Sequence, residues 1–187
     1  MDFESLLSGL TDNWHIWLVT VTLVVAAVID GKQLKVPNWI TFPMILSGWG
    51  FNAAVLGWEG LGLSLLGTVV GLGLLLPAYA IGGMGAGDVK LLAGVGAWVG
   101  STVTFYSFCL SAVIGGVIAI AMIVFQRGWA RHKSQFLVIL NEIATVGSPT
   151  ELSAIAADRK SSMLLLPYGI PIAIGTILYF FWAGMLV

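Results

Sequence analysis

Charged residues are scarce in this sequence. Asp, Glu, Lys and Arg make up 9% of its 187 residues, whereas 58% are hydrophobic. A soluble domain carries about a quarter charged residues, because its surface must stay hydrated. So few charges exclude a soluble globule of this size, and a net charge of −1 gives no support for nucleic-acid binding. We therefore expect lipid to surround most of the chain.

Cysteine and histidine are also nearly absent. The single cysteine, Cys109, can form neither an internal disulfide nor a Cys-x-x-Cys zinc site, and we interpret it as a packing residue in an apolar run. His15 and His132 are expected on opposite sides of the membrane, so they cannot hold one metal ion. The sequence predicts no cofactor and no metal site.

Long apolar stretches are abundant. A helix needs roughly 20 apolar residues to cross the hydrocarbon core of a bilayer. No basic residue precedes position 14, so the first stretch is expected to remain as a membrane span rather than a cleaved signal peptide. The tract from 91 to 125 is too long for one span, and we divide it near Gly100. These features predict an all-α polytopic membrane protein, a single domain over residues 1–187, whose six transmembrane helices lie at about 14–29, 40–56, 61–81, 89–99, 102–125 and 163–186.

Basic residues occur in alternate connections only. The first, third and fifth connections hold all eight Lys and Arg: Lys32, Lys35, Lys90, Arg127, Arg131, Lys133, Arg159 and Lys160. The positive-inside rule then places these connections in the cytoplasm and both termini outside, in the periplasm. The fifth connection, 126–162, is the one sizeable loop. Its opening residues, 126–133, mix basic residues with a tryptophan, which suits either a helix on anionic lipid headgroups or a solvated loop.

Two acids stand at the expected cytoplasmic ends of apolar stretches. Asp30 closes the first stretch and Asp88 opens the fourth, so both are expected at one face and similar depth. Converging carboxylates can share one proton, because two like charges at close range cannot both ionise cheaply. The ionised acid can activate water while the protonated one polarises a carbonyl, which hydrolyses a peptide without metal. Taken singly, each acid also suits an interfacial charge at a helix end, and Asp88 suits a helix N-cap.

Glycines crowd the residues just before the second acid. Residues 82–87 read Gly-Gly-Met-Gly-Ala-Gly and offer an unhindered backbone that an extended substrate strand can approach. A glycine-rich turn before a helix can also hold a phosphate. Asp88 would repel such a ligand, however, and no Gly-Lys-Ser/Thr sequence follows.

Three blocks of the sequence resemble the prepilin peptidases of the Gly-x-Gly-Asp membrane aspartic proteases, in particular the short form associated with Tad/Flp pili. The blocks are residues 30–39, 83–92 and 166–173, and their matching positions are Asp30, Pro37, Asn38, Gly85, Gly87, Asp88, Lys90, Pro167, Tyr168 and Gly169. Pro171 departs from the pattern, at a place where a small residue is expected and a proline can kink the helix.

The resemblance implies a function. It implies Asp30 and Asp88 as the catalytic pair, no cofactor, and a prepilin substrate whose leader is cleaved at the cytoplasmic face of the bacterial inner membrane. Larger bifunctional members carry a cysteine-rich domain and also N-methylate the mature pilin. The sequence shows no such cysteine-rich domain, so the resemblance implies the peptidase activity and leaves methylation open.

Several supporting features leave alternatives open. Lys90 suits either a pair with a carboxylate or a positive-inside anchor, and Tyr168 suits a hydrogen bond near the site or, preferably, an interfacial belt. The spacings Gly67-x-x-x-Gly71 and Gly96-x-x-x-Gly100 permit close helix packing, but among 24 glycines we interpret them as chance.

Three other functional classes compete with the peptidase. A small transporter would use Asp30 and Asp88 to carry protons or cations, although transporter sites favour the bilayer midplane. A presenilin-like protease is expected to have a Tyr before its first acid, where this sequence has Ile29. A non-catalytic scaffold gives no reason for paired acids.

Overall fold

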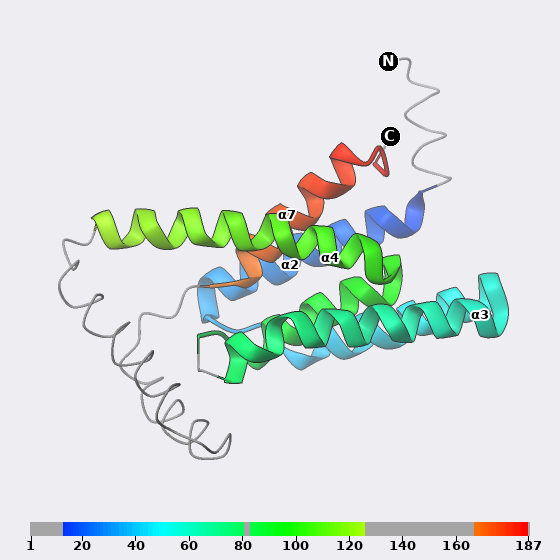
Figure 1. Cartoon of the computed structure of the whole chain (residues 1–187). Coiled ribbons are helices and arrows are strands. Elements are labelled where there is room, and N and C mark those ends of the chain that lie inside the picture. Colours follow the sequence, from blue (N-terminus) through cyan, green and yellow to red (C-terminus); the bar gives the residue numbers. More distant parts are fainter. Residues whose placement is uncertain (1–12, 81–82, 126–166, 187) are drawn as a thin grey trace.

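The computed structural model describes residues 13–80, 83–125 and 167–186. Every regular element within these ranges is a helix: α2 (Trp14–Gln33), α3 (Asn38–Ala80), α4 (Ala86–Phe125) and α7 (Gly169–Trp182) (Figure 1). Helices α2 and α3 and residues Ala86–Met122 of α4 are long and apolar enough to cross a membrane, while α7 is a shorter apolar helix. The all-α prediction is confirmed. The predicted loop at 126–162 lies outside the described residues.

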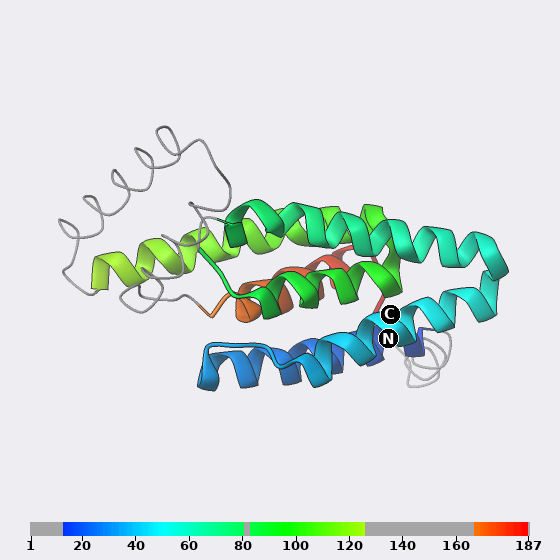
Figure 2. The same ribbon diagram turned by 90° about the horizontal axis from the view of Figure 1, so that it is seen from below.

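Helices α3 and α4 each consist of two segments that fold back on one another. As straight helices, their 43 and 40 residues would each extend about 60 Å, roughly twice the hydrocarbon thickness. The path reverses at Gly57 (φ 63°) and at Gly100 (φ 77°), as Figures 1 and 2 show. The Trp49 Nε1 donates to Thr68 Oγ1 at 2.9 Å although the two are 19 residues apart. The predicted division near Gly100 is confirmed, and six membrane crossings stay a prediction.

Glycine is required at these reversals for its backbone conformation. A Cβ built at Gly57 or Gly100 meets no atom within 4 Å, so space does not exclude a larger residue. Both glycines combine a positive φ with an extended ψ, −142° at Gly57 and 176° at Gly100, and this region costs other residues about 1–3 kcal/mol.

The second segment of α3 and the first segment of α4 touch backbone to backbone. A Cβ on Gly67 would overlap the carbonyl oxygen of Gly96, and one on Gly96 would overlap that of Gly67. One turn further on, a Cβ on Gly71 would lie 2.6 Å from the carbonyl oxygen of Leu92. The interpretation of these spacings as chance was therefore wrong, because three of the four glycines make a close helix contact.

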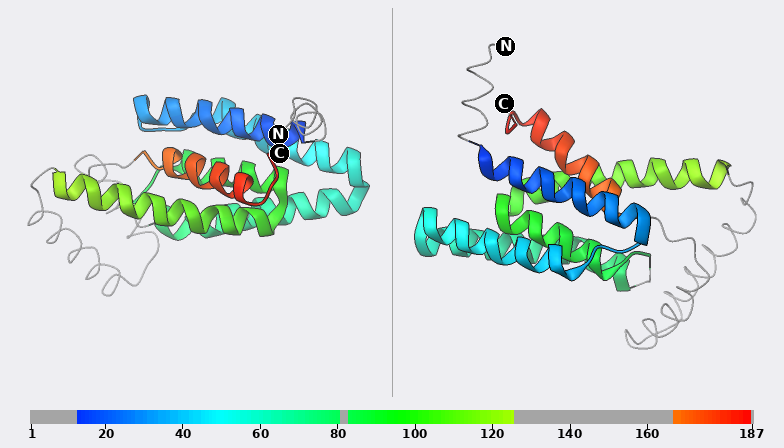
Figure 3. Two further views of the ribbon diagram at one scale, coloured as in Figure 1. Left: turned by 90° about the horizontal axis from the view of Figure 1, so that it is seen from above. Right: turned by 180° about the vertical axis from the view of Figure 1, so that it is seen from behind.

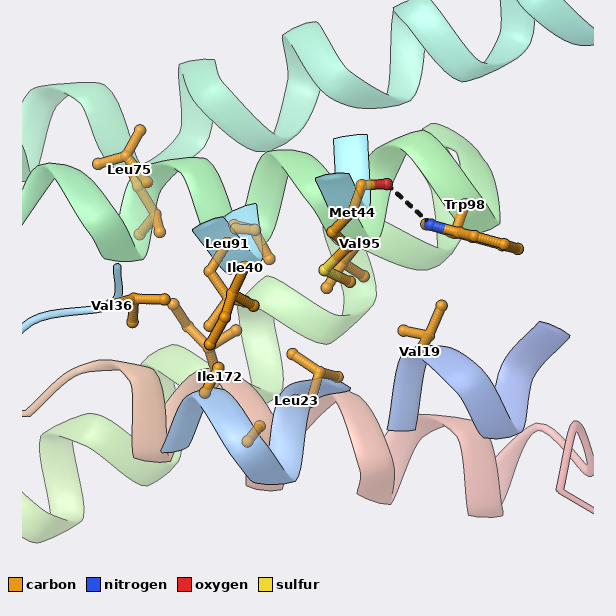
Figure 4. Packing of buried hydrophobic residues seen from close by; sticks show 14 of the residues in the cluster. Val19, Leu23, Val36, Ile40, Met44, Leu75, Leu91, Val95, Trp98 and Ile172 are labelled. Carbon is orange, nitrogen blue, oxygen red and sulfur yellow. Dashed lines mark hydrogen bonds between the residues drawn. The ribbon is translucent and has the colours of Figure 1, made fainter. Parts of the chain in front are cut away.

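An apolar core joins all four helices (Figure 4). Helix α7 packs against both α2 and α4, as the two views of Figure 3 show. The Trp98 Nε1 donates to the carbonyl oxygen of Met44 at 2.9 Å and so ties α4 to α3. Large apolar side chains also cover the outside: Trp58 and Trp182 are 88% and 80% exposed. An apolar exterior of this kind suits contact with lipid. The core residues labelled in the figure are Val19, Leu23, Val36, Ile40, Met44, Leu75, Leu91, Val95, Trp98 and Ile172.

Two helix ends differ from the sequence predictions. Helix α2 continues past residue 29 to Gln33, so Asp30 lies inside its last turn. Helix α7 ends at Trp182 rather than at 186, and a turn with Gly184 at φ 68° follows. Pro171 is the third residue of α7, where its missing N–H has no intrahelical partner to lose, so it need not kink the helix.

Candidate active site

Asp30 and Asp88 lie at the same end of the helix bundle. The end of α2, the start of α4 and the start of α7 meet there (Figures 1 and 2). Both side chains are buried, with 1% of Asp30 and 4% of Asp88 exposed. Buried carboxyl groups are costly unless they are hydrogen-bonded, so their neighbours decide what this site can do.

The start of α7 holds the Asp30 carboxyl group. The backbone N–H of Gly169 donates to Asp30 Oδ2 at 2.8 Å. A Cβ on Gly169 would lie 2.9 Å from that oxygen and 3.1 Å from Asp30 Cβ, so this approach requires glycine. The carbonyl oxygen of Asp30 accepts from the Leu34 N–H at 2.8 Å, and Leu34 closes α2 in the left-handed conformation. Gly169 belongs to the Pro-Tyr-Gly block, but nothing in the sequence indicates that its amide binds Asp30.

Asp88 lies in the first turn of its helix. It is the third residue of α4, and its Oδ2 accepts from the backbone N–H of Gly85 at 3.1 Å. The N-cap alternative for Asp88 is therefore wrong. The acid instead reaches back from the third helical position to the N–H of the cap residue, as the acidic member of a capping box does.

The glycines before Asp88 serve close packing. A Cβ on Gly87 would overlap the carbonyl oxygen of Val36, and one on Gly85 would lie 3.2 Å from Asp88 Oδ2. Gly87 therefore lacks a side chain because of a contact within the protein, and the approach of a substrate strand to this backbone stays a prediction. Gly82 lies outside the described residues.

Lys90 contacts the start of α3. Its Nζ donates to Asn38 Oδ1 at 3.0 Å and lies 4.8 Å from the centroid of the Phe42 ring. These neighbours, rather than the carboxylate considered from sequence, are the contacts that the structure shows for Lys90. Pro37 immediately precedes α3, and its carbonyl oxygen accepts from the N–H of Ile40 at 3.1 Å.

Tyr168 lies within the site. A Cβ on Gly115 of α4 would be 2.9 Å from the Tyr168 ring, so the ring packs closely on that helix. Pro167 precedes Tyr168, and its carbonyl oxygen accepts from the N–H of Ile170 at 3.2 Å. Tyr168 precedes Gly169, whose amide binds Asp30, so it lies beside the first acid, and its interpretation as an interfacial belt residue stays a prediction.

The described ranges bring no three His, Cys, Asp or Glu residues together as metal ligands. The polar groups described at this end of the bundle include two carboxyl groups, each accepting from a backbone amide, and the phenol of Tyr168, which precedes the amide donor Gly169. Such a set can hold and transfer protons.

The sequence profile of the type IV leader peptidase family matches residues 17–120, more than half of the chain. The chain belongs to the type IV leader peptidase family. The matched region contains both acids, whereas the turn at 167–169 follows it.

Three relatives of this family member illustrate the extent of the similarity. All three are described as "Prepilin leader peptidase/N-methyltransferase". That of Aeromonas salmonicida (strain A449) is 32% identical over 125 residues, covering 63% of this chain and 42% of the relative. That of Neisseria gonorrhoeae is 36% identical over 112 residues (56% and 39%), and that of Stutzerimonas stutzeri 33% over 138 residues (65% and 47%). The match thus spans less than half the length of these curated relatives. No solved structure matches the chain.

Proposed function

We propose that this family member is a membrane aspartic endopeptidase that removes the basic leader peptide from type IV-like prepilins of the Tad/Flp class. The observation that carries the proposal is the pair Asp30 and Asp88, both buried at one end of the bundle and each hydrogen-bonded to a backbone amide. The printed names of the relatives support the substrate class. The peptidase half of those names is the activity proposed for this chain.

The two acids divide the work of peptide hydrolysis. Close carboxyl groups share one proton, so one is ionised and the other neutral. The ionised acid takes a proton from water as that water attacks the scissile carbonyl, and the neutral acid donates to the developing oxyanion. The amides of Gly169 and Gly85 fix one oxygen of each acid, which reduces the reorganisation the reaction requires.

The cut is proposed to occur at the cytoplasmic face of the bacterial inner membrane. Lys32, Lys35 and Lys90 lie in or next to the connections at the end of the bundle that holds the acids, and basic residues mark the cytoplasmic side. A short basic leader stays in the cytoplasm for the same reason, and the apolar helix of the substrate stays in lipid. The scissile bond then lies at their junction.

Cleavage of a Tad/Flp-type prepilin by the purified protein in liposomes tests this proposal. We expect mass spectrometry to find one cut between the basic leader and the apolar helix, unaffected by EDTA. Asp30→Asn and Asp88→Asn should each abolish the cut, because an amide cannot exchange the shared proton, while the protein still inserts into the membrane. Near-wild-type cleavage by either variant would show that Asp30 and Asp88 are not the catalytic pair. A cut within the transmembrane helix would favour the presenilin-like alternative.

A further inference from the structure

Lys90 joins the helix of the second acid to the chain that follows the first. Its ammonium group binds the Asn38 side-chain oxygen at 3.0 Å and lies over the Phe42 ring. Asn38 is the first residue of α3, and Phe42 lies one turn further on. Hydrogen bonds of this charge-assisted kind are stronger and more directional than neutral ones.

Lys90 does not face Asp88. Two residues apart on a helix, their side chains leave about 200° around the axis from each other. Lys90 can therefore influence Asp88 only by changing the position of helix α4. On the other side of Asp88, the missing side chain of Gly87 lets α4 touch the backbone of Val36. The first turn of α4 is thus docked on the stretch 36–42 both before and after the acid.

The same stretch is tied to the first acid. It begins two residues after Leu34, whose N–H binds the carbonyl oxygen of Asp30 at 2.8 Å. A short path of backbone and hydrogen bonds therefore runs from Asp30 through residues 34–38 to Lys90 and the first turn of α4. Carboxyl groups share a proton only at close range, and a displacement of about 1 Å near reacting groups can cost roughly 100-fold in rate.

We propose that Lys90 is a positioning residue that, through Asn38 and Phe42, sets the place of Asp88 relative to Asp30. This inference rests on the proposed peptidase function. In this proposal Lys90 acts through the position of its helix rather than on the substrate or the shared proton. Its removal should lower kcat and leave KM unchanged, because substrate binding does not involve the contact.

A double-mutant cycle on Lys90 and Asn38 tests the inference. Lys90→Met and Asn38→Leu should each lower kcat by about 2- to 5-fold, because the contact is exposed to solvent and an exposed charged group binds its partner weakly. The double variant should be no slower than the slower single variant, and Lys90→Arg, which keeps a donor, should recover most of the rate. Glu59→Gln is the control. It removes one charge from an exposed residue near the Gly57 reversal of α3, outside residues 34–42, and should keep wild-type kcat.

Each alternative has its own signature. Wild-type kcat in Lys90→Met, or a raised KM alone, would make Lys90 an anchor or a substrate contact and overturn the inference. Additive losses in the double variant would do the same. Asn38→Asp keeps the acceptor and should keep kcat, so it tests the contact even where Lys90→Met fails to insert. If the wild-type protein leaves the prepilin uncut, the proposed function is wrong, and this inference is wrong as well because it depends on that function. Wild-type cleavage with an unaffected Lys90→Met variant overturns the inference alone.

Discussion

The glycines at the site act through the absence of a side chain. Gly169 and Gly87 have no side chain, and in each case backbone or carboxyl atoms of another segment fill the place of the Cβ. At Gly169 that neighbour is Asp30, and at Gly87 it is Val36. A sequence shows such glycines but not their partners. These partners lie far away along the chain, 139 residues for Gly169 and Asp30. The acids were therefore predictable and the atoms that hold them were not.

Replacing Gly169 with alanine should slow the proposed reaction. The added methyl group would lie 2.9 Å from Asp30 Oδ2 and push the carboxyl group off its amide donor. We expect Gly169→Ala to lower kcat by about 2- to 10-fold, since a hydrogen bond to a neutral carboxyl group contributes roughly 0.5–1.5 kcal/mol. Steady-state cleavage assays measure this effect.

Gly73 supplies the matched control for that substitution. It is exposed in α3, and a Cβ built on it meets no atom within 4 Å. Gly73→Ala should leave kcat unchanged. Equal rates for the Gly169→Ala and Gly73→Ala proteins would show that the Gly169 approach has no part in catalysis.

Helix ends give the two acids different electrostatic surroundings. Asp30 lies in the last turn of α2, where the helix dipole is negative, and Asp88 lies in the first turn of α4, where it is positive. We propose that Asp88 carries the charge of the resting pair and that Asp30 holds the proton. The pair titrates as a unit, so this assignment describes one microstate of the two acids.

Neutralising the two acids should therefore destabilise the protein unequally. Asp88→Asn removes a charge that the start of α4 favours, whereas Asp30→Asn resembles the protonated resting acid. We expect Asp88→Asn to lower the free energy of unfolding by about 0.3–2 kcal/mol more than Asp30→Asn does. Denaturant titration in mixed micelles measures the difference. A larger loss in Asp30→Asn would reverse the assignment of the proton.

Some elements followed from the sequence better than others. Apolar length predicted the helical segments, and the turn residues near Gly100 predicted the reversal within α4, because a left-handed φ selects glycine. The contact between Gly67 and Gly96 was missed, since the spacing of small residues does not reveal which helix they meet. The contact of Lys90 with Asn38 was missed for the same reason, since its acceptor lies 52 residues earlier in the chain.

For the whole molecule, the distribution of basic residues predicts an orientation in the membrane. The connection around Glu59 should face the periplasm, and Lys35 should face the cytoplasm. Because the native Cys109 is exposed, the test uses a Cys109→Ser background. In intact cells a membrane-impermeant maleimide should label Glu59→Cys, and it should label Lys35→Cys only after the membrane is permeabilised. The opposite labelling would invert the topology and place the acids on the periplasmic side.

The hydrogen bond from Gly169 to Asp30 has a consequence for biosynthesis. Asp30 leaves the ribosome early, but its amide donor follows 139 residues later, at the start of α7. At a typical elongation rate of about 5–20 residues per second, that interval lasts on the order of ten seconds. During this time α2 and α4 are already available to the membrane, yet the first acid lacks the partner that orients it. Peptidase activity would therefore begin only when translation reaches α7, so a nascent or truncated chain would leave neighbouring substrates uncut.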